Sequence, residues 1–384
     1  MTNIQDIAAR IGVSVATVSR ALNGSPEVSD ATRERILRLA RELDYTPSAA
    51  ARTLVRRRSH VVGVILETGP GHPDLLHPFF QEVLVGLQHG AGEQGYDLLL
   101  FASDEPGNGF GGRHSYARRA EHHGVGGVVA MGFDGRHPEM RKLIGAGIPC
   151  MAVDADLGGD RCGFVMSENR QGAALAVEHL LDLGHERVAT IAGPLAIPPG
   201  ADRLAGYREA LERRGLEAPA DYMIEGDFYD ESGYAATRRL LELPQPPTAI
   251  FAASDLMAAG ALRAAHELGV RVPDELAIVG FDDIALAALI QPSLTTVRQN
   301  TEALGQAAAE GLIRMIEDAD APPVQVHVPT QLVVRASSGA KEASRERTRG
   351  IDEGGGAELW RRSVRPPSDD GAAVVTDAGN TQEA

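Results

Sequence analysis

From Val61 onwards, the sequence alternates short apolar runs with longer stretches of helical character. The apolar runs read VVGVIL, YDLLLF, GGVVAM, IPCMAV, RVATIAG, YMIEGDF, TAIFAA and LAIVGF. Strands and helices that alternate in this way build parallel sheets with helices on both faces. Eight strands over this length predict two such sheets, and hence an α/β body of two lobes.

The chain of 384 residues has room for a smaller module before this body. Residues 1–60 contain ten arginines and six acidic residues, a balance of +4, whereas the remaining 27 basic and 47 acidic residues give −20. A basic head on an acidic body is typical of nucleic-acid binding, but an arginine-rich terminus without that function has the same charge. The pattern of residues within the head therefore has to distinguish a nucleic-acid-binding module from an arginine-rich terminus without that function.

Two short helices around a turn are predicted at the start of the head. Apolar residues recur at helical spacing on the first helix, before Gly12 ends it: Ile4, Ile7, Ala8 and Ile11. Ser14 is placed to cap a second helix over residues 15–22. The outward face of that helix carries small residues and one arginine: Ala16, Ser19 and Arg20. Such a face can enter the major groove of DNA, where Arg20 would contact a guanine edge or a phosphate.

A third helix is expected to begin near Ser29 and Asp30. A three-helix interaction bundle would share these features, but the string IQDIAARIGVSVATVSRALNG is far more specific. Through it the chain resembles the LacI/GalR family of bacterial repressors, from Thr2 to about Ser338. The resemblance implies that Val15, Ala16 and Arg20 face base edges. It also places six polar side chains near phosphates: Ser14, Thr17, Ser19, Asn23, Ser29 and Thr32.

The segment TPSAAARTLVRRRSH after Tyr45 favours a short helix, with Pro47 at its first position. Isolated helices shorter than about 12 residues are marginal in water, so this one should form only when a partner holds it. The resemblance implies that it is the family's hinge helix, which pairs with its dimer mate in the minor groove and inserts a leucine between base steps. Leu54 matches that leucine and Ala51 lies beside it, whereas the arginines that follow fit a solvated linker equally well.

The resemblance also implies a domain organisation. The expected fold is a small all-α helix-turn-helix head and a periplasmic-binding-protein-like α/β effector domain of two lobes, with a parallel sheet in each. The chain would cross between the lobes near Ser167, Thr295 and Pro323. The implied segments are 1–46 for the DNA-binding domain, 47–59 for the hinge, 60–166 with 296–322 for the first lobe, and 167–295 with 323–338 for the second lobe. Residues 339–384 lack an apolar period and are predicted to be disordered.

Candidate ligand-binding residues follow from the strands. Open parallel sheets bind ligands just beyond the carboxyl ends of their strands, which here gives four candidates: Asp154, Phe228, Ser254 and Asp282. Arg203 lies early in the helix after RVATIAG, near the same edge. Carboxylates accept hydroxyl hydrogens, arginine donates in a planar fork and an aromatic ring covers an apolar sugar face. This set suits a polyol.

The resemblance matches Arg203 and Asp282 to the family's main polar effector contacts. It matches Phe79 and Phe80, in HPFF, to the wall that the other lobe contributes. Two features depart from the family pattern: a Ser-Asp pair, beginning at Ser254, stands where many relatives have Asn-Asp, and the loop ETGPGHPDLLHPFF is longer than usual.

Structural alternatives stay open for the polar candidates. Asp282 and Ser254 would also serve as helix caps, and Arg203 would also pair with Asp202 or Glu209 on the surface. The sequence alone does not choose between these roles.

Several other functions find no support. Two cysteines form neither a disulfide framework nor a zinc spacing, and they are read as buried thiols. The loop histidines His72 and His77 and the His122-His123 pair lack completing ligands and are read as solvated. The run GVGGVV lacks the dinucleotide spacing, and no nucleophile with its base is visible. The sequence therefore predicts no enzyme, no cofactor and no metal.

The sequence predicts a cytoplasmic transcriptional regulator, since it has neither an export signal nor an apolar run of about 20 residues. It is expected to repress as a homodimer on double-stranded operator DNA, under control of a small effector that is most simply a sugar. A nucleobase corepressor held between Phe79 and Phe228 is the alternative effector. A stand-alone sugar-binding protein is the alternative class, but it would not carry the head.

Overall fold

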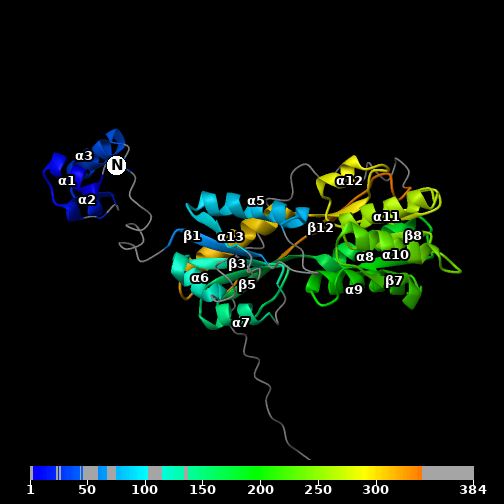
Figure 1. The fold of residues 1–384 in the computed structure, drawn as a ribbon. Coiled ribbons are helices and arrows are strands. Elements are labelled where there is room, and N and C mark those ends of the chain that lie inside the picture. Colours follow the sequence, from blue (N-terminus) through cyan, green and yellow to red (C-terminus); the bar gives the residue numbers. More distant parts are fainter. Residues whose placement is uncertain are drawn as a thin grey trace, which may run out of the picture.

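The structure is a computed structural model that describes residues 3–22, 25, 27–43, 45, 59–66, 75–102, 115–133 and 137–339. Figure 1 shows a helical head at the N-terminal end and an α/β body of two lobes that lie side by side. Some predictions fall outside the described residues: the hinge helix with Ala51 and Leu54, the phosphate contact of Asn23, the residues 67–74 of the long loop, and the tail from residue 340 onwards.

The head consists of three short helices, α1 (Ile4–Ile11), α2 (Val15–Leu22) and α3 (Asp30–Glu42). Gly12 ends α1 with a φ of 77°, a left-handed conformation that favours glycine. The Ser14 hydroxyl accepts the N–H of Thr17 at 3.1 Å, and Ser29 caps α3 through the N–H of Thr32. The helices enclose their own apolar core, formed by Ile7, Ala8, Val18, Ala21, Val28, Ile36 and Ala40. The predicted helical head is confirmed.

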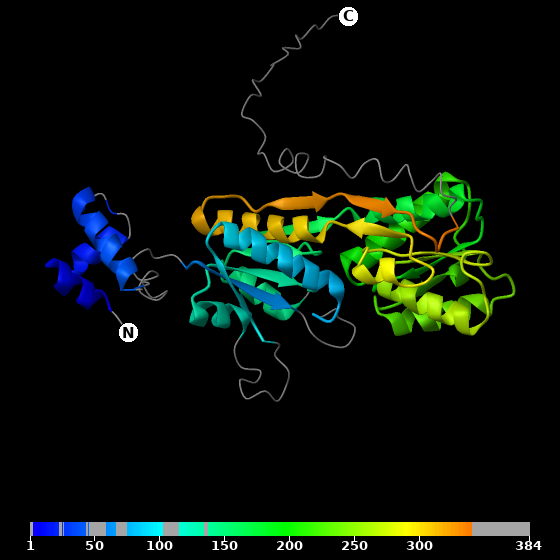
Figure 2. The same cartoon turned by 90° about the horizontal axis from the view of Figure 1, so that it is seen from above.

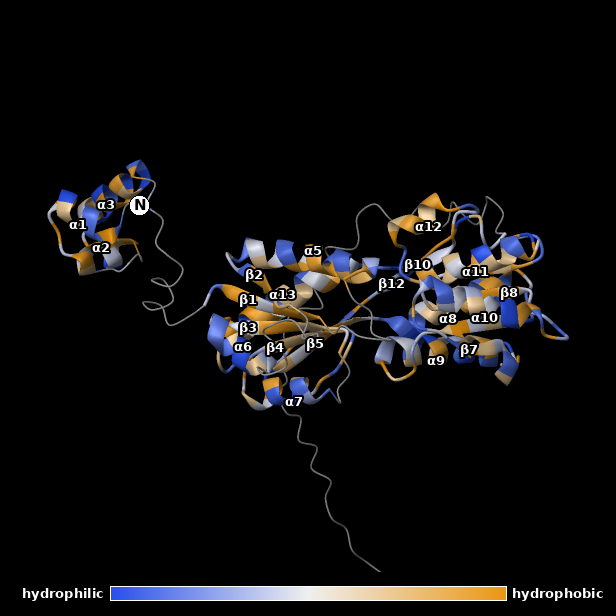
Figure 3. Cartoon of the chain, in the orientation of Figure 1, coloured by the Kyte–Doolittle hydropathy of each residue, from blue (hydrophilic) through white to orange (hydrophobic). Residues whose placement is uncertain are grey.

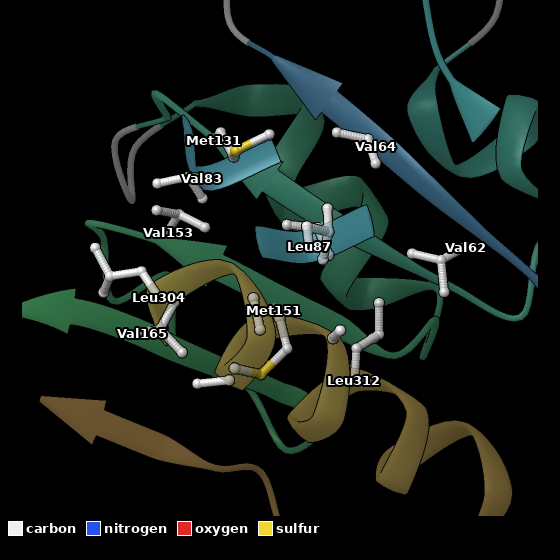
Figure 4. Packing of buried hydrophobic residues seen from close by; sticks show 14 of the residues in the cluster. Val62, Val64, Val83, Leu87, Met131, Met151, Val153, Val165, Leu304 and Leu312 are labelled. Carbon is white, nitrogen blue, oxygen red and sulfur yellow. The ribbon is translucent and has the colours of Figure 1, made fainter. Parts of the chain in front are cut away.

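The first lobe contains a parallel six-stranded sheet in the order β11-β5-β4-β3-β1-β2. Its strands are β1 (Val61–Leu66), β2 (Asp97–Leu100), β3 (Gly127–Met131), β4 (Cys150–Val153), β5 (Cys162–Ser167) and β11 (Gln325–Val328). Two helices cover each face of the sheet: α5 (Pro78–Glu93) and α13 (Thr301–Glu317) on one face, and α6 (Tyr116–His123) and α7 (Pro138–Gly145) on the other. Figure 4 shows the first face, where Leu87 and Leu312 pack over Val62 and Met151.

The second lobe contains a parallel four-stranded sheet in the order β7-β6-β8-β9. Its strands are β6 (Val188–Ala192), β7 (Met223–Glu225), β8 (Ala249–Ala252) and β9 (Ala277–Val279). One face is covered by α8 (Asn169–Asp182) and α9 (Pro198–Arg213), and the other by α10 (Asp230–Leu241) and α11 (Asp255–Glu267). Three further elements complete this region: the short helix α12 (Ala285–Leu289) and an antiparallel pair of β10 (Thr296–Gln299) and β12 (Thr330–Val333).

All eight predicted runs contain a strand, but β5, β10, β11 and β12 were not predicted. These four carry the chain between the lobes. The first crossing follows β5, which ends at Ser167. However, β10 packs Val297 into the core of the second lobe, and β11 pairs with β5 in the first lobe. The second crossing therefore follows Gln299 instead of Thr295, and the third follows Val328 instead of Pro323.

Hydropathy follows these layers. In Figure 3 the strands β1 and β3 are apolar at the centre of the first lobe, while the helices around them carry hydrophilic residues. Cys150 and Cys162 pair in register on β4 and β5 as free, buried thiols. None of the helices in the described ranges has the length and apolar character of a membrane span.

The helices α5 and α13 lie side by side along the first lobe, coloured cyan and orange-yellow in Figure 2. Glycines allow their backbones to touch. A Cβ atom at Gly305 would lie 2.2 Å from the carbonyl oxygen of Val83, and one at Gly86 would lie 2.4 Å from the carbonyl oxygen of Glu302. Any larger residue would force the two helices apart.

Gly305→Ala is therefore expected to lower the free energy of unfolding by about 1–3 kcal/mol, the usual cost of inserting a carbon into a packed interior. Gly92, also on α5, provides the matched control because a Cβ there would meet no atom within 4 Å. Gly92→Ala should instead stabilise the protein by about 0.5–1 kcal/mol. Urea unfolding of both variants measures the difference. Equal effects would show that α5 and α13 separate without cost.

Candidate functional site

A cavity lies between the two lobes, at the carboxyl ends of strands from both sheets. It spans about 480 Å³ when the open space at its mouth is counted. The residues that line it are His77, Phe79, Phe80, Gly132, Phe133, Val153, Asp154, Ile197, Pro199, Arg203, Phe228, Asp282 and Gln299. Six of the seven predicted ligand-binding residues are among them. The strand-end rule therefore leads to the cavity that the structure contains.

Arg203 is the centre of the polar side of the cavity. It lies on the first turns of α9 and its side chain is almost fully buried. Its Nε donates to Asn169 Oδ1 at 2.8 Å, and one terminal nitrogen donates to the carbonyl oxygen of Ala253 at 2.6 Å. The same nitrogen lies 3.5 Å from Asp282 Oδ1, and the guanidinium stacks 3.8 Å from the ring centre of Phe281. The alternative of a surface pair with Asp202 or Glu209 is not what the structure shows.

Three residues that line the cavity have a backbone conformation that side chains rarely adopt. Asp154, Phe228 and Asp282 have φ angles of 58°, 73° and 124°. Each lies just after a strand, where the chain turns towards the cavity. Such conformations cost roughly 1–3 kcal/mol each and persist only where the surroundings hold them, which is typical of functional sites. Their concentration at one cavity supports a binding role.

The cavity also contains buried oxygen atoms without a hydrogen-bond donor. Among the described residues these include Asp154 Oδ1, Asp282 Oδ2 and Gln299 Oε1. The other ends of two of these groups are occupied, since Gln299 Nε2 donates to Asp282 Oδ1 at 2.7 Å. A buried acceptor without a donor costs about 1–3 kcal/mol. A ligand that brings donors to these three positions would recover that energy.

The carboxyl groups of Asp154 and Asp282 share a single cation, the guanidinium of Arg203. Burial raises the pKa of Asp154 from its ordinary value of 3.8 to about 6, although Arg203 lowers it. Burial likewise raises the pKa of Asp282 to about 6, against the attraction of Arg203 and the hydrogen bond from Gln299. Burial lowers the pKa of Arg203, while both carboxylates raise it. The site therefore carries excess negative charge at neutral pH.

Asp154→Asn is expected to stabilise the ligand-free protein at about pH 7.5, because the amide has no charge to bury. A rise in pKa from 3.8 to about 6 corresponds to at most about 3 kcal/mol. Between these two values the folded protein holds a proton that the unfolded chain has released, so wild-type stability falls as pH rises through this window. The stability that Asp154→Asn gains over wild type should therefore shrink towards zero near about pH 4. Denaturant unfolding across this range measures it, and a pH-independent difference would contradict the assignment.

Ser254 was predicted to bind the ligand, but it does not line the cavity. Its hydroxyl caps α11 by accepting the N–H of Met257 at 3.1 Å and donates to the carbonyl oxygen of Phe228 at 2.9 Å. The cap alternative is therefore the observed role. Ser254 acts on the site indirectly, by holding the strained backbone of Phe228.

Asp255, the next residue, holds a second part of the site. It is buried, and its two carboxylate oxygens accept the N–H of Ile284 at 2.9 Å and the hydroxyl of Thr296 at 2.5 Å. These bonds fix the turn that carries Asp282. Burial and the nearby charge of Asp282 raise the pKa of Asp255 well above its ordinary value. The role of Asp255 was not predicted, whereas the cap at Ser254 was the alternative that the sequence left open.

His77 is a second correction, since it was expected to be solvated. It occupies the N-cap position of α5 without capping the helix, and only 4% of it is exposed. Its ring lines the cavity and meets the ring of Tyr229, from the other lobe, edge-on at 5.6 Å. His122 and His123 are exposed, and His72 lies outside the described residues. No group of three or more potential metal ligands occurs in the part of the chain that the structure describes.

Other residues that line the cavity were not predicted from the sequence. Phe133 follows β3 in the same way that Asp154 follows β4, so the strand-end rule applied to GGVVAM would have found it. Gln299 could not be found because β10 was not recognised as a strand. Aromatic residues form the apolar wall: Phe79, Phe80, Phe133 and Phe228. Gly193 makes room for this wall, since a Cβ there would lie 2.2 Å from the Phe228 ring.

The head presents a second candidate surface. The predicted base-contacting residues Val15, Ala16 and Arg20 are exposed on α2. Arg20 lies 3.3 Å from Glu27 in an ion pair whose two side chains are more than half exposed. Four of the six predicted phosphate contacts lie at the starts of helices, where the hydroxyls pair as Ser14 with Thr17 and Ser29 with Thr32. Ser19 is partly buried on α2.

Comparisons with known proteins cover both parts of the chain. Residues 3–48 match the bacterial regulatory proteins of the lacI family, and residues 177–338 match a periplasmic binding protein-like domain. The ribose operon repressor of Halalkalibacterium halodurans is 37% identical, over 90% of this chain and 99% of that protein. The HTH-type transcriptional regulator CelR of Thermobifida fusca is 36% identical, over 87% and 97%. The repressor PurR of Escherichia coli is 31% identical, over 88% and 97%.

Solved structures give the same result. The complex of the transcriptional regulator CelR with cellobiose aligns with a TM-score of 0.65 and 34% identity, over 88% of this chain and 100% of that one. The Lac repressor dimer bound to operator and the anti-inducer ONPF aligns with a TM-score of 0.74 and 28% identity, over 88% and 99%. Both alignments span the head and the two lobes.

Proposed function

Because the chain belongs to the lacI family of bacterial regulatory proteins, we propose that it represses transcription under the control of a small effector, a sugar, bound between its lobes. The observation that carries this proposal is the combination of a helix-turn-helix head with a cavity that both lobes line. The relatives include a ribose operon repressor and a regulator solved with cellobiose, which supports a sugar.

DNA binding is assigned to the head. A single recognition helix reads too few bases for useful specificity, so two copies of the chain are proposed to bind a nearly palindromic operator. The Lac repressor, a related protein, is a dimer on its operator. The hinge residues Ala51 and Leu54, which lie outside the described residues, are proposed to contact the minor groove between the two half-sites. A protein that acts on the genome in this way works in the cytoplasm.

Effector control is proposed to act through the lobes. A ligand shifts a conformational balance only by binding one arrangement more tightly than another. Arg203 and Asp282 belong to the second lobe, whereas Phe79, Phe80 and Asp154 belong to the first. A ligand that touches both sets therefore favours one spacing of the lobes, and the first lobe transmits it to the hinge.

Two competing functions are less well supported. A stand-alone binding protein would not need the basic head, and the relatives span head and body together. An enzyme would need a reacting group positioned for chemistry. Asp154 and Asp282 lie beside a guanidinium that is already hydrogen-bonded, an arrangement that suits recognition. We therefore assign a binding function to the cavity.

The test combines DNA and ligand. The full chain should select a palindromic sequence from a random DNA pool, and this binding should weaken steeply with salt because phosphate contacts dominate affinity. Sugars that raise the melting temperature of the protein should then change its affinity for the selected DNA. The absence of any selected sequence would contradict the assignment of the head.

A further inference from the structure

Taking the proposed function as its premise, we propose that the effector is an uncharged polyhydroxyl compound, and that the cavity excludes sugar phosphates, sugar acids and nucleobases. The family includes regulators whose names point to different ligand types, such as ribose, cellobiose and purine regulation. The choice among them for this chain rests on the donors, acceptors and charges in the described cavity.

The hydrogen-bonding groups of the cavity favour a ligand that donates. Three buried acceptor atoms line the cavity without a donor: Asp154 Oδ1, Asp282 Oδ2 and Gln299 Oε1. Each hydroxyl group of a sugar donates one hydrogen, so an uncharged sugar can satisfy all three. A phosphate or ionised carboxylate group brings only acceptors at neutral pH. Placed against these oxygens, it would leave them unsatisfied and add its own lone pairs.

The charges in the cavity favour a neutral ligand. Arg203 is the one permanently charged cation among the described lining residues, and it faces the carboxylates of both Asp154 and Asp282. Two of its nitrogens already donate, to Asn169 and to the carbonyl oxygen of Ala253. An anionic ligand would therefore add a third negative charge to a buried site that compensates only one. Like charges at close range among buried groups are strongly unfavourable.

Sugars and nucleobases differ in where they carry their donors. Hypoxanthine offers two ring N–H donors, which is fewer than the three acceptors, and the amino groups of other purines add donors only in the plane of the base. Its flat faces would need two roughly parallel aromatic walls. Phe79 and Phe80 meet edge-on, at an angle of 75° between their rings, so the two rings do not form one flat surface for a base to stack on. Phe228, on the opposite side, faces the Arg203 guanidinium at 5.5 Å. This arrangement gives an apolar wall and a polar wall, as a sugar ring requires.

The test uses matched ligands on the full chain. The probes are D-ribose with D-ribose 5-phosphate, D-glucose with D-glucose 6-phosphate and D-glucuronate, D-galactose with D-galacturonate, cellobiose, and hypoxanthine. At least one uncharged sugar should raise the melting temperature, and its anionic counterpart should bind at least about tenfold more weakly, a difference of about 1.4 kcal/mol. An anionic compound or hypoxanthine that binds more tightly than every uncharged probe would overturn the proposal, as would the failure of all uncharged probes.

A variant tests whether charge causes the preference for an uncharged sugar over its anionic counterpart. Asp154→Asn removes one carboxylate, so the gap in affinity between the neutral sugar and its anionic counterpart should narrow. Glu209→Gln is the matched control, because Glu209 also lies on α9 but pairs with Arg170 at the surface and does not line the cavity. It should leave the gap unchanged. A gap that Asp154→Asn does not alter would overturn the electrostatic explanation.

The ligand-binding measurements can be read without assuming that the head binds DNA. Melting temperatures and calorimetry report ligand binding whether or not the head binds DNA. Selection of an operator from random DNA, without ligand, tests the repressor assignment on the same preparations. Failure of DNA selection with clear sugar binding would contradict only the proposed function, and the reverse pattern would contradict only the ligand class.

Discussion

Asp282→Asn is expected to abolish the response of operator binding to the effector and to leave the operator affinity of the ligand-free protein nearly unchanged. Asparagine has nearly the same shape as aspartate, so it adds little to the strain of the φ of 124°, and it can still accept the hydrogen bond from Gln299. It replaces the buried acceptor Oδ2 with a donor and removes the charge next to Arg203. Loss of a charged hydrogen bond costs about 1.5–3 kcal/mol, so effector affinity should fall by about 10- to 100-fold.

Arg203→Ala should have the same functional effect with a larger cost in stability. It leaves Asp154 and Asp282 without their cation and removes the donor to Asn169. Breaking a buried charge arrangement in this way costs about 3–5 kcal/mol. The head has a separate core, so operator affinity of the folded variant should persist.

The matched control for Arg203 is Arg170→Ala. Arg170 is an exposed arginine on α8 that pairs with Glu209 at the surface, where ion pairs contribute little. It should leave both stability and effector response close to wild type. The measurement is operator affinity with and without the effector, at fixed salt. If Arg203→Ala and Asp282→Asn both respond like wild type at the same effector concentration, the ligand binds elsewhere.

Arg20→Ala is expected to weaken operator binding by about 1–3 kcal/mol, concentrated at one base pair in each half-site. Arg20 is exposed on the outward face of α2, and its ion pair with Glu27 is solvent-exposed. Such pairs are worth about 0–1 kcal/mol, so DNA can replace this partner at little cost. A phosphate contact would instead weaken binding to every sequence equally. Affinities for a set of single-base operator variants distinguish the two.

Glu27→Gln is the control for this experiment. It removes the partner of Arg20 without touching the arginine, so operator affinity should stay the same or rise slightly. Binding that is equally strong for wild type and Arg20→Ala on every operator variant would show that another element reads the bases.

The regular parts of the fold were predictable because their signals are local. A few neighbouring residues are enough to recognise helix caps such as Ser14 and Ser29. The same holds for the eight apolar runs. The crossing strands gave no such signal, since β10 and β11 read TVRQ and QVHV and lie at the edge of a sheet or between the lobes. Their position is set by pairing with distant strands, which no local pattern reveals.

The site was predictable to the extent that it follows from strand ends. This rule located Asp154, Phe228 and Asp282, but it could not tell a ligand contact from a helix cap. Ser254 satisfied the rule and became a cap because its hydroxyl lies within reach of the Met257 N–H and the Phe228 carbonyl. His77 was misread for the opposite reason: its loop looks solvated in sequence, but the second lobe covers its ring through Tyr229.

The most direct test of the account is operator affinity at fixed salt, with and without the uncharged sugar that stabilises the protein most. Wild type should change its operator affinity by about 5- to 150-fold, the usual range of allosteric coupling, while Asp282→Asn at the same sugar concentration should not respond. If a sugar that demonstrably occupies the cavity leaves the operator affinity of wild type unchanged, the cavity does not control DNA binding.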